Sequence, residues 1–173
     1  MNLPGLQELT GGLGLRPPDL QAALRDGAIA IAGVILAVLL LDAVLFRHAL
    51  SADYIAYYTG PMWPRTLAMC FKAVEEEVVY RLLLMTALVG LMGLVWRRKS
   101  AWIYWVAIIL AQLALAWPEV LATPVWGALR FWAIGCVWGW LYWKNGWLAA
   151  LGAHGLLHLF LDPLLMAALL ATA

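Results

Sequence analysis

The chain has 173 residues, of which 65% are hydrophobic and only 12% are charged, and its mean hydropathy is +0.86. A soluble domain carries about 45–50% apolar and roughly 25% charged residues, so this composition excludes an ordinary soluble domain and indicates an integral membrane protein. The net charge of +1 argues against a nucleic-acid partner, and the two cysteines give neither a disulfide framework nor metal-ligand spacing.

Residues 1–26 are more polar than the rest of the chain, and we expect them to lie on the membrane surface. Asp19 is placed to cap a short amphipathic helix that runs through Arg25 and ends at Gly27. The chain therefore divides into an N-terminal amphipathic surface segment, residues 1–26, and a membrane-embedded domain, residues 27–173.

Five apolar runs follow, each close to the ~20 residues that cross a bilayer or longer. The second run is too long for the hydrocarbon core, so it must tilt, bend or begin outside the membrane. A polar hairpin at 47–64 separates the first two runs, and Pro118 ends the third. The predicted fold is an all-α, polytopic transmembrane helix bundle of about five to six spans, with runs at 27–46, 65–96, 101–117, 123–143 and 147–170.

Basic residues in the predicted loops set the orientation. The positive-inside rule places the side with more Lys and Arg in the cytoplasm. We therefore expect a multi-pass protein of the bacterial inner membrane with a cytoplasmic N-terminus. The basic side carries Arg16, Arg25, Arg97, Arg98, Lys99 and Lys144, and the other side carries Arg47 and Arg65.

Ionisable side chains at membrane depth are the strongest functional signal. Each costs at least ~2.5–3.5 kcal/mol, so they are tolerable only where they converge on one another or on water. In the first cluster, Glu77 and Arg81 are four residues apart on a helix and can pair. Glu76 points about 100° away and is free to act as a general base toward water. The alternative is a buried ion-pair network that fixes helix packing.

The second cluster consists of His154, His158 and Asp162, which share one stripe of the last predicted helix at i, i+4 and i+8. Imidazoles at such positions can bind a metal, donate to an oxyanion or relay protons. The alternative is a hydrogen-bonded contact between helices.

Two segments resemble a known family. EEVVYRLLL, residues 76–84, resembles the Glu-Glu-x-x-x-Arg motif of the CPBP family, the CAAX protease and bacteriocin-processing glutamic intramembrane proteases, which include type II CAAX prenyl endopeptidases. GWLYWKNGWLAALGAHGLLH, residues 139–158, resembles the C-terminal part of that family, which ends in a His-x-x-x-Asn helix. The resemblance covers roughly residues 65–165. It extends to small myxosortase-like members, which are thought to process C-terminal sorting signals.

The resemblance implies roles for the first cluster and for the final helix. Glu76 matches the glutamate that activates water, and Glu77 and Arg81 match its supporting partners. His154 matches the histidine of the final helix. His158 stands where the family often has Asn or Asp, so a role as a polarising donor is altered here.

The middle motif of the family, Phe-x-x-x-His, is where this chain departs. Trp117 occupies the histidine position, and indole is a donor only. Either His158 supplies the missing imidazole, or Trp117 only donates a hydrogen bond, or activity is lost. Glu119 and Gln112 are weaker substitutes. Residues that we expect to bind substrate or support the site are Tyr80, Trp117, Arg130 and Asp162.

These patterns predict an intramembrane endopeptidase that cleaves a membrane-anchored protein or peptide with Glu76-activated water and without a metal or other cofactor. Its partners would be that substrate and the lipid bilayer. One alternative is a metal-dependent CAAX-type protease with Glu76 and two histidines as ligands. Another is a catalytically inactive relative that binds peptides or confers immunity. A proton-coupled transporter is the weakest alternative, because five spans offer no inverted repeat.

Overall fold

The computed structural model describes residues 19–96 and 100–172, and over these ranges the chain is built of helices without strands. The predicted all-α bundle is confirmed. In chain order the helices are α2 (Leu20–Leu39), η1 (Leu40–Leu45), η2 (Arg47–Ala49), α3 (Ala52–Thr59), α4 (Met62–Glu76), η3 (Glu77–Met85), α5 (Thr86–Trp96), α6 (Ala101–Ala122), α7 (Pro124–Gly127), η4 (Ala128–Ala133), α8 (Cys136–Asn145) and α9 (Trp147–Ala171).

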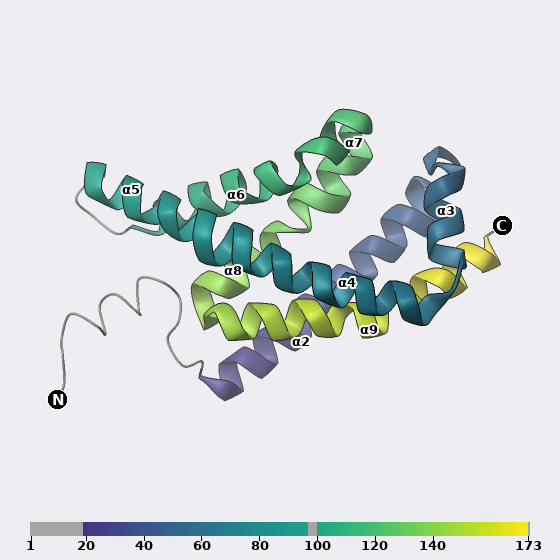
Figure 1. Ribbon diagram of the computed structural model, residues 1–173, viewed down its shortest axis with the longest axis horizontal. Coiled ribbons are helices and arrows are strands. Elements are labelled where there is room, and N and C mark those ends of the chain that lie inside the picture. Colours follow the sequence, from purple (N-terminus) through teal and green to yellow (C-terminus); the bar gives the residue numbers. More distant parts are fainter. Residues whose placement is uncertain (1–18, 97–99, 173) are drawn as a thin grey trace.

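Four helices of the described chain are long and apolar enough to cross a membrane: Leu20–Leu45, Met62–Trp96, Ala101–Ala122 and Trp147–Ala171. The predicted span at 123–143 is instead divided among α7, η4 and α8, with a turn at residues 134–135. These three pieces together lead back from the end of the bundle near α3 to the end where α9 begins (Figure 1). The prediction of an unbroken fourth span is therefore wrong, although the chain reverses direction where it was expected to.

The first helix differs from its prediction at one end. Asp19 caps it as expected, because its side chain accepts hydrogen bonds from the backbone N–H groups of Gln21 and Ala22. The helix does not end at Gly27 but continues without a break into η1. A single glycine inside a helix costs only about 1 kcal/mol, which the surrounding apolar helix formers outweigh. Residues 1–18 of the predicted surface segment lie outside the described residues.

Two prolines lie within helices, one of them at the predicted end of the third run. Pro118 is within α6, which runs on to Ala122. Pro64 falls in the first turn of α4, where a missing N–H has no intrahelical acceptor to lose. The predicted polar hairpin also contains a helix of its own, α3, which Ser51 caps by accepting from the Tyr54 N–H.

Helix α9 is the central element, and it packs against α2, α3, α4 and α8. A stripe of fully buried leucines along it, spaced by four residues, forms the middle of the core with Val34 and Val38 of α2: Leu157, Leu161, Leu165 and Leu169. The outer faces of the bundle are apolar and exposed, as at Phe71 (75%) and Leu94 (77%). Such large exposed apolar side chains are expected of a protein that faces lipid.

The turn before α9 requires a glycine. Gly146 has φ 89°, a backbone conformation that L side chains rarely adopt. It ends α8 and begins α9, so the chain reverses at this single residue, between the predicted runs 123–143 and 147–170. This reversal starts α9 at the depth from which its histidines can reach α4.

Candidate functional site

The two polar clusters meet because α4 and α9 run antiparallel in a specific register (Figure 1). Near one end, the Thr66 hydroxyl donates to Asp162 Oδ2 over 2.9 Å. Farther along, the Cys70 thiol lies 3.4 Å from the Gly155 carbonyl oxygen. Just beyond, His154 Nδ1 lies 2.9 Å from Glu77 Oε1. The first cluster of α4 and η3 is thereby placed against the second cluster of α9.

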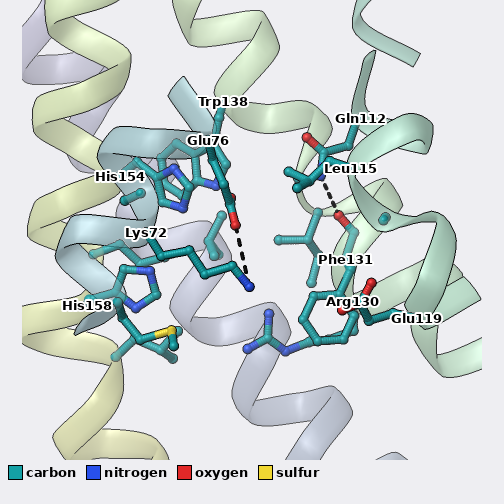
Figure 2. A pocket seen from close by; sticks show the side chains of 18 of the residues that line it. Lys72, Glu76, Gln112, Leu115, Glu119, Arg130, Phe131, Trp138, His154 and His158 are labelled. Atoms are coloured by element: carbon teal, nitrogen blue, oxygen red, sulfur yellow. Dashed lines mark hydrogen bonds and ion pairs between the residues drawn. The ribbon is translucent and has the colours of Figure 1, made fainter. Parts of the chain in front are cut away.

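A cavity of about 140 Å³ opens beside this contact. Of the predicted site residues, Glu76, Arg81, Arg130, His154 and His158 line it, and they come from three different parts of the chain (Figure 2). Other polar or aromatic residues on its wall are Tyr58, Lys72, Gln112, Glu119, Phe131 and Trp138. Ionisable groups of the membrane-spanning helices therefore converge on one hollow, as their desolvation cost requires.

Glu76 and Glu77 have different surroundings although they are adjacent. The Glu76 side chain is 17% exposed and faces the cavity, and its only ion pair among the described residues is with Lys72, at 3.9 Å. Glu77 is fully buried behind the wall, where Oε1 contacts His154 Nδ1 and lies 3.6 Å from Arg81 Nε. Glu76 is thus the carboxylate that water in the cavity can reach, and Glu77 holds its neighbours.

Arg81 links the first cluster to α6 and η4. Its Nη2 donates to Gln112 Oε1 over 2.6 Å and to the Gly135 carbonyl over 3.3 Å. Gln112 Nε2 in turn donates to the Phe131 carbonyl over 2.8 Å. Gly135 was not predicted as a site residue, and Gln112 was considered only as a weaker substitute for the missing histidine. In the sequence, Gln112 is a single amide within an apolar run. A buried amide must find hydrogen-bond partners, so such a residue indicates a polar cluster.

The two histidines sit side by side with their ring centroids 5.6 Å apart. His154 stacks on Trp138, with centroids 4.7 Å apart and planes at 11°, which holds the ring in place. Both histidines have Nδ1 beside a carboxylate: His154 at Glu77, and His158 at Asp162 over 3.4 Å. Nε2 is therefore the nitrogen that each ring has available for a group in the cavity.

Asp162 lies behind His158 and does not line the cavity. It is fully buried, and besides His158 and Thr66 it has Arg65 Nε at 3.6 Å. Arg65 donates to the Tyr57 carbonyl over 2.8 Å and lies over the Tyr58 ring at 5.3 Å. Asp162 thus contacts His158 from the core side.

Arg130 reaches the cavity from η4 and is held by Asp42 of η1, whose Oδ2 accepts from its Nε over 3.0 Å. Asp42 is fully buried and also accepts from the Tyr54 hydroxyl at 2.6 Å and from Trp126 Nε1 at 2.8 Å. Burial raises the pKa of Tyr54, so its hydroxyl stays protonated and remains a donor. Asp42 was not among the predicted site residues.

Two predicted support residues lie elsewhere. Trp117 is 50% exposed and is not on the cavity wall, because the residues of α6 that face the cavity are Gln112, Leu115, Ala116 and Glu119. Tyr80 also lies outside the wall. The structure therefore does not bring the residue aligned with the middle-motif histidine to the other site residues.

Within residues 19–96 and 100–172, no three His, Cys, Asp or Glu side chains are grouped so that they could hold a metal ion. The histidines and Glu76 share a cavity wall without forming such a ligand set. The described chain thus offers no three-ligand zinc site of the kind that hydrolases use.

Comparison with known proteins bears on the same region. The family model for type II CAAX prenyl endopeptidase Rce1-like proteins matches residues 58–160, more than half of the chain. No curated protein and no solved structure matches the chain significantly. The matched segment begins in α3, includes both polar clusters and ends in α9 after His158. The chain therefore belongs to the type II CAAX prenyl endopeptidase Rce1-like family and is a membrane-embedded protease of the CAAX type.

Proposed function

We propose that this protein is a glutamic intramembrane endopeptidase that cleaves a membrane-anchored peptide with water activated by Glu76. The observation that carries the proposal is the meeting of the Glu76 carboxylate with His154 and His158 on one cavity wall. A carboxylate supplies the base for hydrolysis, and imidazole groups supply donors for the charge that develops on the substrate.

In the proposed reaction, Glu76 takes a proton from water while the water oxygen attacks the peptide carbonyl carbon. The carbonyl oxygen becomes an oxyanion, to which His154 and His158 donate hydrogen bonds. As the tetrahedral intermediate collapses, the C–N bond breaks and the proton held by Glu76 moves to the leaving amine. The products are a carboxylic acid and an amine, and Glu76 returns to its starting state.

The buried partners would position these groups. Glu77 holds His154 through Nδ1, and Arg81 holds Glu77 and the carbonyl of Glu76, the latter at 3.5 Å. Asp162 holds His158 in the same way. Removing either carboxylate would leave a ring free to rotate, and misplacement by about 1 Å can cost 10²-fold in rate.

The substrate class and orientation belong to the same proposal. We propose that the protein lies in a bacterial inner membrane with its N-terminus in the cytoplasm and cleaves the C-terminal sorting signal of exported proteins. The apolar exterior and the small mass outside the helices favour a substrate that is itself held in the membrane.

A second candidate is a relative that binds peptides without cleaving them. The observation that favours it is that α6 contributes Gln112 and Glu119 to the cavity and no imidazole. Neither side chain reproduces the base and donor properties of histidine together.

Cleavage by the protein in lipid vesicles separates these candidates. The probes are two membrane-anchored reporter peptides, one with an apolar C-terminal sorting tail and one with a farnesylated CAAX tail. We expect Glu76→Gln and His154→Ala each to slow cleavage by about 10²-fold or more. Cys70→Ala and Cys136→Ala, which change partly buried thiols, should leave the rate unchanged.

Full activity of Glu76→Gln, or loss of activity in Cys136→Ala, would reject the mechanism. Binding of a reporter without cleavage by the unaltered protein would favour the second candidate. A chelator should not change the rate, whereas a loss that added Zn²⁺ restores would favour a metal-dependent protease.

A further inference from the structure

Arg130 has an unused pair of donors at the cavity. Its side chain is only 10% exposed, and it extends from η4 into the cavity that Glu76 and the histidines also line (Figure 2). Its Nε is bound to Asp42, but among the described residues neither Nη nitrogen makes a hydrogen bond. Neither Nη nitrogen is among the buried atoms that lack a partner, so both are open to water in the cavity, and a ligand there can take the place of that water.

The Asp42 contacts fix the direction of that free edge. Asp42 is fully buried and receives donors from Tyr54, Trp126 and Arg130, which come from α3, α7 and η4. The guanidinium carbon also lies 5.1 Å from the centre of the Phe131 ring. Because Asp42 holds Nε and the Phe131 ring lies alongside, the two Nη nitrogens face the cavity in one orientation.

Two parallel N–H donors of a guanidinium match the two oxygens of a carboxylate. We propose that Arg130 binds the α-carboxylate of a substrate whose bond to be cleaved lies within a few residues of its C-terminus; this rests on the proposed hydrolysis at Glu76 and not on the sorting-signal substrate.

Net charge alone does not explain this recognition. Glu76 and Glu119 also line the cavity, and neither forms an ion pair with Arg130 in the described part of the chain. Their charges oppose an anion, whereas Lys72 and Arg81, which also line the cavity, are paired with Glu76 and Glu77. Binding at Arg130 therefore depends on its two-donor geometry. Arg130→Lys keeps the positive charge beside Asp42 but lacks the two parallel N–H donors, so the lysine variant should not bind the carboxylate as arginine does.

Binding of matched peptides tests the subsite separately from catalysis. The probes are S-farnesylated peptides ending in Cys-Val-Leu-Ala, one as the free acid and one as the C-terminal amide, titrated onto Glu76→Gln protein in nanodiscs. We expect the acid to bind about 10- to 100-fold more tightly than the amide. Arg130→Gln and Arg130→Lys should remove the difference. Arg25→Gln, which alters an arginine that is 70% exposed and pairs with Asp26, should keep it.

Each other outcome overturns the subsite. Equal binding of acid and amide, or no binding of either, contradicts it, and this comparison needs no Arg130 variant to fold. A third peptide, amidated and ending in Asp, separates the sources of the carboxylate: if it binds as tightly as the acid, a side-chain carboxylate replaces the chain end as the ligand. Cleavage without acid selectivity would overturn the subsite and leave the proposed function intact. Acid-selective binding without cleavage by the unaltered protein would support the subsite and overturn the proposed function.

Discussion

Glu76 and Glu77 illustrate how residue-scale chemistry depends on burial. The two carboxylates are adjacent, yet one faces a cavity and the other is fully buried with Arg81 and His154. A buried ion pair gains little over an apolar pair, but removing one partner leaves an uncompensated charge. The Glu77–Arg81 pair is therefore expected to matter more for keeping the site intact than for net stability.

Replacing Glu77 or Arg81 alone should cost more stability than half of what replacing both residues costs. We expect Glu77→Gln or Arg81→Met alone to lower the free energy of unfolding by about 3 kcal/mol. The double variant should lose less than the sum of the two, because no unpaired charge remains. Denaturant titration in detergent micelles, followed by tryptophan fluorescence, measures both quantities.

The control for this cycle is the exposed pair of Arg25 and Asp26. Arg25→Gln should cost no more than about 1 kcal/mol, since exposed pairs contribute little. Strict additivity of the Glu77 and Arg81 changes would show that these side chains do not act as a pair.

At the scale of elements, three π-helical segments carry polar residues of the site. Asp42 lies in η1, Glu77 and Arg81 lie in η3, and Arg130 lies in η4. In η1 and η4 a backbone N–H bonds five residues back, as from Phe46 to Leu41 and from Ile134 to Leu129. Such widened turns are rare and occur frequently at functional sites. Here they set the directions in which these side chains leave their helices.

Gly135, in the turn between η4 and α8, lies close to Gln112 of α6. A Cβ atom built on it would lie 2.1 Å from Gln112 Nε2 and 2.4 Å from the Phe131 carbonyl oxygen. Gly135→Ala must therefore displace Gln112 and with it the partner of Arg81. We expect cleavage of the reporter peptide to fall by about 10-fold or more, together with a lower melting temperature.

The matched control is Gly152→Ala in α9, where a Cβ would meet nothing within 4 Å. This change should leave activity unaltered and stabilise the helix by up to about 1 kcal/mol. Equal effects of the two alanine variants would mean that the close approach at Gly135 has no role in the site.

For the whole molecule, the arrangement of helices indicates from which side the cavity is reached. Tyr58 of α3 and Glu119 near the end of α6 both line it, and both lie toward the end of the bundle that carries α3 and α7 (Figure 1). In the proposed orientation, which follows the positive-inside rule, that end faces the outside of the membrane. We therefore expect the cavity to open outward, which suits an exported substrate.

Thiol labelling of single-cysteine variants tests the side of access. Met69 lines the cavity, so Met69→Cys in a Cys70→Ala, Cys136→Ala background should react with a membrane-impermeant maleimide added to intact cells. Asp53→Cys in α3 should react from the same side, and Lys144→Cys only after the membrane is opened. Reaction of Met69→Cys from the cytoplasmic side alone would contradict outward opening and favour a cytosolic CAAX-like substrate.

Composition and periodicity were sufficient to predict the all-helical membrane bundle, the reversal at Gly146 and the stripe of His154, His158 and Asp162. The physical reason is that backbone and side-chain polar groups at membrane depth must find partners within the protein, which leaves a 173-residue apolar chain few arrangements other than a helix bundle. The motif resemblance also indicated the family that the matched residues 58–160 show. Only the tertiary structure separated cavity-facing Glu76 from buried Glu77, placed Trp117 outside the cavity and joined Asp42 to Arg130 across 88 residues. Those outcomes depend on helix register, on π-helical turns and on a glycine contact between distant segments. None of these is encoded in the local hydrophobic pattern, because each arises from which helix faces meet.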